Sequence, residues 1–276
     1  MNKIASVLTI ALTSFAVSFR SPLPVEFSCS KSVVEPDGSG FVVGYTQNLS
    51  SAEEEPLVSL INEELSRGNF EVEVPSDEYS LEDLLSAGIR ATHTPSLFYI
   101  GTSFSVEQDD GSFIVNFVPV YDNCEAKKKA LEQLRSEIIS KTADISDEKL
   151  KVKYVYDYLC SRFEYGTESE AKCQNAYEVL TKNVTLCQGY SYAFKYLLDG
   201  MGIPSEVYIG YGKTPEGYER HAWNSVEFDG ETCYIDVTYG DEKQLGFWHW
   251  YFLSEKEFIQ NHVPFKEFPM KMKSFA

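Results

Sequence analysis

Residues 184–198 read VTLCQGYSYAFKYLL and carry the pattern on which the rest of the interpretation depends. Apolar residues recur at i, i+3, i+4, i+7, i+8 and i+11, a spacing typical of one buried face of an α-helix: Tyr190, Ala193, Phe194, Leu197, Leu198 and Met201. Gly202 and Pro204 follow and predict that the helix ends there. Cys187 therefore lies at the first turn of this helix, or one residue before it.

The position of Cys187 suggests chemistry but does not establish it. At a helix N-terminus, unpaired backbone N–H groups and the positive end of the helix dipole favour a thiolate over a thiol. The same N–H groups can bind the oxyanion that forms when sulfur attacks a carbonyl. A small buried side chain is nevertheless the commoner role of an isolated cysteine. The helix alone does not distinguish these two interpretations.

A second stretch, residues 221–237, reads HAWNSVEFDGETCYIDV and predicts a β-hairpin. Asp229-Gly230 is a typical two-residue turn between two strand-like runs. This turn predicts three cross-strand pairs: Phe228 with Glu231, Trp223 with Asp236, and His221 with Thr238. His221 and Asp236 are then diagonal neighbours on one face, with Cα atoms roughly 7–8 Å apart, a gap that an aspartate can bridge to an imidazole.

Together, Cys187, His221 and Asp236 fit a cysteine–histidine–aspartate triad. In such a triad Cys187 attacks an acyl carbon and His221 transfers protons, while Asp236 fixes the tautomer of His221 and stabilises its imidazolium form. The alternative is a structural hairpin with an ordinary histidine and a surface aspartate, the role of most single His and Asp residues. The joint pattern favours the triad.

Around these residues the chain resembles the transglutaminase-like superfamily over about residues 150–240. The matching segments are Asn175 to Leu180, Leu186 to Tyr190, Leu197 to Pro204, His221 to Asn224 and Tyr234 to Thr238. The resemblance is closest to the bacterial branch of exported or envelope proteins, and residues 53–121 resemble the region that often precedes the core there. It implies an α+β fold with a papain- or transglutaminase-like core, in which the cysteine helix packs on an antiparallel sheet that carries His and Asp.

The resemblance also implies acyl-transfer chemistry on amides of a protein or peptide substrate, with a cell-envelope component as a further candidate. The reaction would be peptide or isopeptide hydrolysis, or transfer of a glutamine acyl group to an amine. Animal transglutaminases use a tryptophan upstream of the cysteine to hold the oxyanion, whereas all three tryptophans here lie downstream: Trp223, Trp248 and Trp250. The oxyanion donors would then be the Cys187 backbone N–H and a second group such as the Gln188 side chain. This departure leaves hydrolysis at least as well supported as transamidation.

Three aromatic residues are candidates for lining an acyl groove: Trp223, Tyr208 and Tyr211. Aromatic residues at such positions are more often part of the core.

Two other functional classes stay open. One is a non-catalytic protein- or cell-wall-binding module on the same fold. The other is a different enzyme on a related core, such as an amide-cleaving deglycosylase or an arylamine acetyltransferase, although the sequence shows no support for a coenzyme A groove.

The N-terminal residues predict export. A short basic start is followed by an apolar, uncharged run over residues 4–19 and by Arg20, a pattern typical of a signal peptide. The run is short for a membrane span, and a buried helix or strand is the alternative. We therefore expect four parts: a signal peptide over 1–20, a linker or irregular segment over 21–52, a small α+β region over 53–122 and a catalytic domain over 123–276. The expected location is secreted or in the cell envelope, without a stable membrane span.

Charge and cysteine content narrow the choice of partners and cofactors. The formal net charge of -18 argues against nucleic acid or an anionic membrane surface as a partner. No two of the six cysteines have CxxC spacing, so we expect neither a zinc site nor a cofactor. Two histidines, His249 and His262, have no partner that the sequence identifies, and we expect each to be a core or surface residue.

Overall fold

The computed structural model describes residues 7–11, 56–109, 111–166, 175–215, 217–241 and 251–264. The chain divides into two compact units, residues 1–45 with 51–124 and residues 46–50 with 125–276. Only Val7–Ala11 of the expected signal segment is described, and the expected linker, 21–52, lies outside the described residues. Within the described ranges, no helix has the length and apolar content needed to cross a bilayer.

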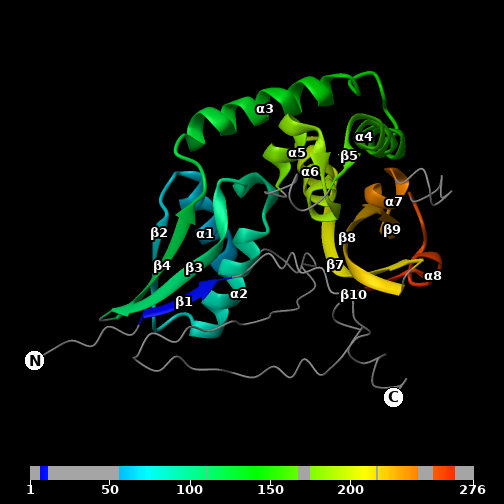
Figure 1. The fold of residues 1–276 in the computed structure, drawn as a ribbon. Helices are drawn as coiled ribbons and strands as arrows, with labels where there is room; N and C mark the ends of the chain where they lie inside the picture. The colour runs from blue at the N-terminus through cyan, green and yellow to red at the C-terminus, as the bar shows by residue number, and fades with distance from the viewer. Residues whose placement is uncertain are drawn as a thin grey trace, which may run out of the picture. The chain divides into compact units, whose positions relative to one another are not determined.

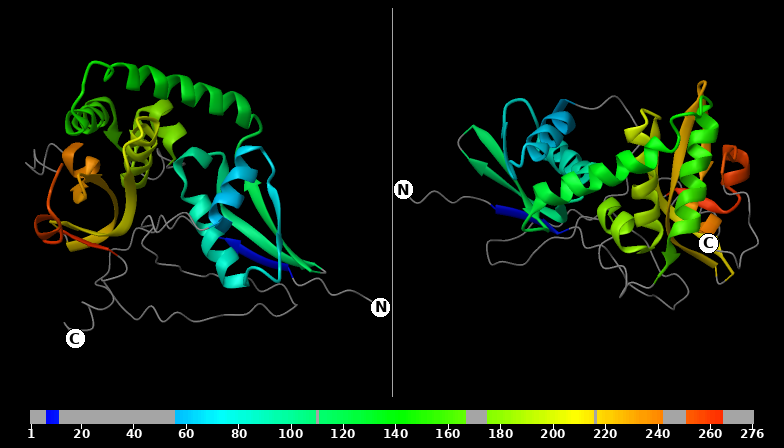
Figure 2. Two further views of the ribbon diagram at one scale, coloured as in Figure 1. Left: turned by 180° about the vertical axis from the view of Figure 1, so that it is seen from behind. Right: turned by 90° about the horizontal axis from the view of Figure 1, so that it is seen from above.

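The first unit is a four-stranded antiparallel sheet in the order β1-β3-β4-β2, with both of its α-helices on one face (Figures 1 and 2). Its elements are β1 (Val7–Ala11), α1 (Pro56–Ser66), β2 (Glu71–Pro75), α2 (Leu81–Thr92), the 3-10 helix η1 (Pro95–Leu97), β3 (Ile100–Asp109) and β4 (Ser112–Pro119). Burial alternates along β2 and along most of β4, because successive strand residues point to opposite faces and the helices cover one of them. Helix α2 begins at a capping box formed by Ser80 and Asp83.

Strand β1 lies within the segment expected to be a signal peptide. It pairs antiparallel with β3, Val7 opposite Glu107 and Ala11 opposite Ser103, and forms one edge of the sheet. Residues 7–11 of the apolar run thus form a strand in this structure.

The second unit is built on another four-stranded antiparallel sheet, in the order β10-β7-β8-β9. A short parallel pair of strands, β5 with β6, comes before this sheet in the sequence. The elements are α3 (Cys124–Ser140), α4 (Glu148–Arg162), β5 (Glu164–Tyr165), α5 (Ala176–Lys182), β6 (Val184–Thr185), α6 (Cys187–Gly200), β7 (Ser205–Thr214), β8 (Gly217–Phe228), β9 (Glu231–Ile235), α7 (Val237–Asp241), α8 (Glu255–Phe258) and β10 (His262–Pro264). Mixed helix and antiparallel sheet make this an α+β fold.

Helix α6 is the central helix of the second unit. The five predicted core residues from Tyr190 to Leu198 are all fully buried, and Gly202 follows the helix with a φ of 70°. The helix is buried on more than the one predicted face, because α4, α5 and α7 pack around it in addition to β7 and β8 (Figure 1). A helix surrounded in this way fixes the position of its first residue, Cys187.

The predicted hairpin forms, but its second strand is shorter than expected. The turn is at Asp229-Gly230, where both residues have positive φ, and five pairs follow the predicted register from Phe228 with Glu231 to Asn224 with Ile235. The two outer pairs were predicted wrongly, since β9 ends at Ile235 and α7 begins at Val237. Asp236 therefore lies at the junction between a strand and a helix.

Candidate active site

Cys187 is the first residue of α6 and is half-buried. The preceding residue, Leu186, provides no side-chain hydrogen bond to cap the helix. The backbone N–H groups of this first turn are therefore not engaged by a capping side chain, the arrangement that favours an anion at a helix start.

The first turn of α6 packs tightly because its third residue is glycine. A Cβ atom at Gly189 would lie 2.0 Å from Thr185 Oγ1 and 2.7 Å from Val179 Cγ2. Only a residue without a side chain allows the helix start to approach β6 and α5 this closely. Gly189 thereby fixes where the Cys187 thiol lies.

His221 lies on β8, is 7% exposed and connects the other two members of the predicted triad. Its Nε2 atom is 2.7 Å from Asp236 Oδ2. Cys187 also interacts with this side chain. Burial alone would lower the pKa of His221, but the charge and hydrogen bond of Asp236, together with Cys187, raise it well above the usual range. The geometry therefore favours the imidazolium form of His221, paired with the carboxylate of Asp236.

Asp236 is fully buried and accepts hydrogen bonds on both carboxylate oxygens. Oδ1 accepts the backbone N–H of Tyr239 at 3.0 Å and so caps the start of α7. Oδ2 accepts from His221 at 2.7 Å and lies 2.8 Å from Nε2 of His262. Burial would raise the pKa of Asp236, but the charge and hydrogen bond of His221 and the bond to His262 hold it far below its usual range. The carboxylate is ionised and held on three sides.

His262 is the residue of this site that the sequence analysis missed. It lies on the edge strand β10, opposite Gly212 of β7, and is fully buried. Its ring stacks on Phe258, with centroids 3.8 Å apart. Burial lowers the pKa of His262 in spite of Asp236, so the neutral ring is favoured. The short apolar run that ends in Pro264 is typical of an edge strand, but nothing in it points to Asp236.

The ring of His221 is held by stacking as well as by hydrogen bonds. Tyr239 lies against it with ring centroids 4.6 Å apart and planes 20° apart, and its hydroxyl donates to the backbone carbonyl of Lys213 at 3.0 Å. A Cβ at Gly212 would lie 2.3 Å from that hydroxyl and 2.9 Å from the His221 ring. Gly212 therefore makes room for the stack.

Asn224 links the sheet to the cysteine helix. It is fully buried, and its Nδ2 donates to the backbone carbonyls of Ser191 on α6, at 3.1 Å, and of Glu206 on β7, at 3.2 Å. The Ser191 hydroxyl in turn donates to the carbonyl of Cys187 at 3.0 Å. The strand that carries His221 is thus tied to the helix that carries Cys187 by side-chain hydrogen bonds.

The residues predicted to line an acyl groove are not brought together. Trp223 is 1% exposed and belongs to a buried aromatic cluster with Tyr239 and Phe258, against which Tyr208 packs. The Tyr208 and Trp223 rings stack with centroids 6.1 Å apart. Tyr211 is an odd number of residues from Tyr208 on β7 and so lies on the opposite face of the strand. Trp223 is therefore a core residue and is not exposed to a substrate.

Gln188, the predicted second oxyanion donor, is half-buried directly after Cys187. Its side chain is hydrogen-bonded to Tyr192, one turn further along α6. An amide side chain carries two N–H donors and a carbonyl, so a single bond to Tyr192 leaves it capacity for another partner.

The His221, Asp236 and His262 side chains have the ligand types that metal ions prefer, and their candidate atoms lie within 4.8 Å of one another. Both Nε2 atoms, however, already lie at hydrogen-bond distance from the same Asp236 oxygen. Hydrogen bonds therefore account for the close approach of the three groups without an ion.

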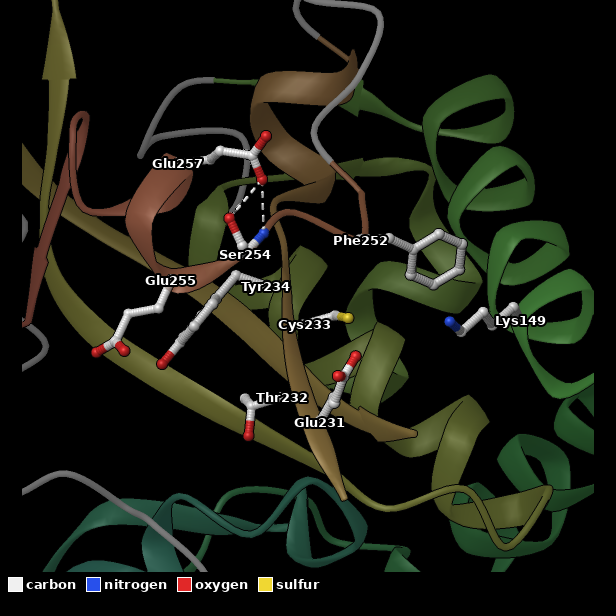
Figure 3. A pocket seen from close by; sticks show the side chains of 9 residues that line it. All are labelled: Lys149, Glu231, Thr232, Cys233, Tyr234, Phe252, Ser254, Glu255 and Glu257. Atoms are coloured by element: carbon white, nitrogen blue, oxygen red, sulfur yellow. Dashed lines mark hydrogen bonds between the residues drawn. The ribbon is translucent and has the colours of Figure 1, made fainter. Parts of the chain in front are cut away.

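A surface pocket of about 650 Å³ lies elsewhere on the second unit (Figure 3). It is lined by Lys149, Glu231, Thr232, Cys233, Tyr234, Phe252, Ser254, Glu255 and Glu257. In Figure 3 the Glu257 carboxylate is turned toward Ser254, whose backbone N–H donates to it at 2.9 Å as part of the capping box of α8. Neither Cys187 nor His221 lines this pocket.

Comparison with known proteins gives one family match. Residues 134–238 match the model of the transglutaminase-like superfamily, a span that lies within the expected catalytic domain and contains Cys187, His221 and Asp236. No curated protein matches the chain at a significant level.

Solved structures give weaker matches. A TGase aligns with 60% of this chain and 48% of its own at 17% identity, with a TM-score of 0.38. A candidate cysteine protease from Cytophaga hutchinsonii aligns with 49% and 56% at 16% identity and a TM-score of 0.36. The periplasmic domain of TgpA from Pseudomonas aeruginosa, bound to ethylmercury, aligns with 50% and 59% at 17% identity and a TM-score of 0.31. The chain thus spans about half the length of each of these structures. On the family match, the chain contains a domain of the transglutaminase-like superfamily over residues 134–238.

Proposed function

We propose that the second unit is a cysteine-dependent enzyme that acts on amide bonds through an acyl-enzyme on Cys187. The observation that carries this proposal is the pair formed by His221 Nε2 and Asp236 Oδ2, 2.7 Å apart, together with the interaction of Cys187 with the same imidazole. A nucleophile beside a base that a third group orients is the arrangement that activates sulfur for acyl transfer.

In the first half of the proposed reaction, the Cys187 thiolate attacks the carbonyl carbon of an amide and forms the C–S bond. The C–N bond then breaks as the His221 imidazolium gives its proton to the leaving nitrogen. The products of this half are a free amine and a thioester on Cys187, with His221 neutral. Asp236 keeps the His221 ring oriented throughout by its hydrogen bond to Nε2.

In the second half, water or an amine attacks the thioester and loses a proton to His221. The C–S bond breaks and Cys187 leaves as the thiolate, which restores the ion pair with the His221 imidazolium. Water yields a carboxylic acid, so the net reaction is hydrolysis, whereas an amine yields a new amide. The proposed oxyanion donors are the backbone N–H of Cys187 and the side chain of Gln188, whose bond to Tyr192 limits its motion.

The proposed substrate is a protein or peptide, with a cell-envelope component as a specific candidate. The net charge of -18 disfavours nucleic acid, and the apolar N-terminal run supports a secreted or envelope location. Fusing residues 1–20 to a reporter that is active only outside the cytoplasm tests the location. Retention of the reporter inside the cell would contradict it.

The test of the chemistry follows alkylation of each cysteine by iodoacetamide across pH, with mass spectrometry to identify the modified residue. The structure describes four free cysteines, so Cys124, Cys160 and Cys233 serve as internal references for Cys187. We expect Cys187 to react rapidly below pH 7, and to lose this reactivity in His221→Ala. If Cys187 reacts no faster than the references, the enzyme proposal fails and the binding-module interpretation replaces it.

The type of acyl transfer is then resolved with a library of peptide amides in ¹⁸O-labelled water and a labelled primary amine. Incorporation of ¹⁸O into the product identifies hydrolysis, and incorporation of the amine identifies transfer. Cys187→Ala must abolish both, while Cys233→Ala, which changes a half-buried free cysteine away from the triad, must abolish neither.

A further inference from the structure

The carboxylate of Asp236 is shared by two histidines. His221 and His262 place their Nε2 atoms 2.7 Å and 2.8 Å from the same oxygen, Oδ2. The two rings come from different strands, β8 and β10, and their centroids are 5.5 Å apart. A cysteine–histidine–aspartate triad needs only the first of these histidines.

The charges of the buried groups show what the second histidine can do. Asp236 and His262 are both fully buried, and His221 is 7% exposed. Burial disfavours a charged His262, and the His221 imidazolium at the same oxygen repels a second cation. His221, which also contacts the thiol of Cys187, is the ring that gains from being charged. His262 is therefore the neutral ring, and it donates its Nε2 proton to Asp236.

The surroundings of His262 hold it in place for this role. Its ring stacks on Phe258 and lies edge-on to Trp223, at centroid distances of 3.8 Å and 5.0 Å. The titratable groups that face it are Asp236, His221 and the more distant hydroxyl of Tyr239, whose ring centroid is 5.0 Å away.

We propose that His262 is a positioning residue of the site, which acts through Asp236 rather than on the substrate. By donating a second hydrogen bond to Oδ2, it keeps the buried carboxylate ionised and turned toward His221. The ionised carboxylate stabilises the His221 imidazolium, and the imidazolium in turn stabilises the Cys187 thiolate. The inference rests on the proposed thiol chemistry of Cys187 and adds a fourth member to its site.

Two substitutions separate the hydrogen bond from the packing. His262→Phe keeps an aromatic ring that can stack on Phe258 but removes the donor, whereas His262→Gln keeps an N–H donor near the position of Nε2 and cannot titrate in this range. His93→Gln is the control, because His93 is a half-buried histidine that lies in the first unit. The measurement is the pH at which alkylation of Cys187 reaches half its maximum rate, in the full chain.

Without this donor the ionised carboxylate of Asp236 is less firmly turned toward His221, so the imidazolium that stabilises the Cys187 thiolate is itself less stabilised. We expect His262→Phe to raise the half-maximal pH for Cys187 by about one unit, the size of one hydrogen bond to a charged group. His262→Gln should restore most of this shift, and His93→Gln should leave the value unchanged. If the wild type reacts below pH 7 and His262→Phe reacts identically, His262 only fills the core and the inference is overturned while the proposed function stands. If the wild type shows no rapid reaction, both fail.

A measurement on the unmodified protein guards against a variant that does not fold. The chain has only four histidines, so ¹⁵N-histidine NMR can assign each ring. We expect His262 to be neutral and protonated at Nε2, and His221 to be protonated at both nitrogens. A His262 ring protonated at Nδ1 alone would overturn the proposal, since it could not donate to Asp236.

Discussion

The two units of this chain use the same architecture, a four-stranded antiparallel sheet with helices, in different ways. In the first unit, burial alternates along β2 and β4, and the buried residues of the sheet are apolar. In the second, six consecutive residues of β8, from His221 to Val226, are buried, and three of them are polar. Among the described residues, all the buried polar and charged side chains lie in the second unit.

This difference indicates that the unit that carries the candidate site buries polar groups at a cost in stability. A buried polar group destabilises a fold unless hydrogen bonds compensate for its lost hydration. The second unit provides such bonds at Asp236, with three donors, and at Asn224, which donates to two backbone carbonyls. The first unit contains none of the triad residues, and it therefore supplies controls for changes at the site.

The largest expected effect is the loss of activity in Cys187→Ala. If Cys187 is the nucleophile, turnover of an amide substrate should fall by at least about 10⁴-fold, while the urea midpoint changes little because Cys187 is only half-buried. Cys124→Ala, which changes a half-buried cysteine at the other unit's boundary, should leave turnover unchanged. Equal turnover in wild type and Cys187→Ala would show that Cys187 is not the nucleophile.

The second prediction concerns two histidines whose protonation affects stability in opposite directions. Burial lowers the pKa of His93 to about 4, so the unfolded state binds a proton that the folded state excludes. The His93 contribution is fully present above about pH 6.5 and is lost as pH falls from about 6.5 to 4, by up to about 3 kcal/mol. Burial also acts to lower the pKa of His221, but Asp236 raises it to about 10, so its stabilisation is fully present below about pH 6.5 and is lost as pH rises toward 10.

Urea unfolding from pH 4 to 10 measures both contributions. His93→Gln should flatten the acid side of the stability profile, and His221→Gln should flatten the alkaline side. A His93→Gln profile that keeps the full acid slope would show that other groups cause it.

The third prediction compares two glycines on helices. A Cβ at Gly189 would lie 2.0 Å from Thr185 Oγ1, and a Cβ at Gly88 on α2 would lie 2.5 Å from the Phe104 ring. Each change to alanine forces neighbouring groups apart, and we expect a cost of about 2–3 kcal/mol in the free energy of unfolding for both. Only Gly189→Ala should also slow alkylation of Cys187, because it displaces the start of α6. Equal alkylation rates in the two variants would show that the helix start is not positioned by this contact.

The smallest effect is expected for two asparagines. Asn224→Ala removes two buried hydrogen bonds to carbonyls of α6 and β7, which should destabilise the chain by about 1–2 kcal/mol. Asn116→Ala on β4 removes one longer bond, 3.4 Å to Glu107, and should cost less than about 0.5 kcal/mol. Thermal unfolding of both variants measures the difference, and a larger loss in Asn116→Ala would contradict it.

Much of the fold could be predicted from local patterns. The helix after Cys187 and the turn at Asp229-Gly230 both depend on neighbouring residues, and the structure confirms both. The end of β9 was predicted wrongly because Val237 and Thr238 are β-branched and favour a strand, whereas the Asp236 side chain caps a helix there instead. Strand length here depends on one side-chain hydrogen bond that alternation does not reveal.

The candidate site was only partly predictable. The hairpin turn led to the expectation that His221 lies near Asp236, although the two outer strand pairs behind that expectation do not form. His262 is 26 residues from Asp236 and reaches it only because β10 pairs with the far edge of β7. The aromatic residues proposed for a groove, Trp223 and Tyr208, pack in a core cluster instead. Pairing between distant strands and the burial of both faces of β8 are tertiary effects, and the local sequence carries no signal for either.

The position of Asp236 at the junction of β9 and α7 has a consequence for how the site can be observed. The amide proton of Tyr239 is held by the same carboxylate that orients His221. Its hydrogen-exchange rate therefore reports on whether the site is assembled, without any substrate or label at Cys187. A ligand that displaces Asp236 would release this proton to solvent, and one that binds without disturbing it would not, so a single backbone resonance could classify inhibitors by their mode of action.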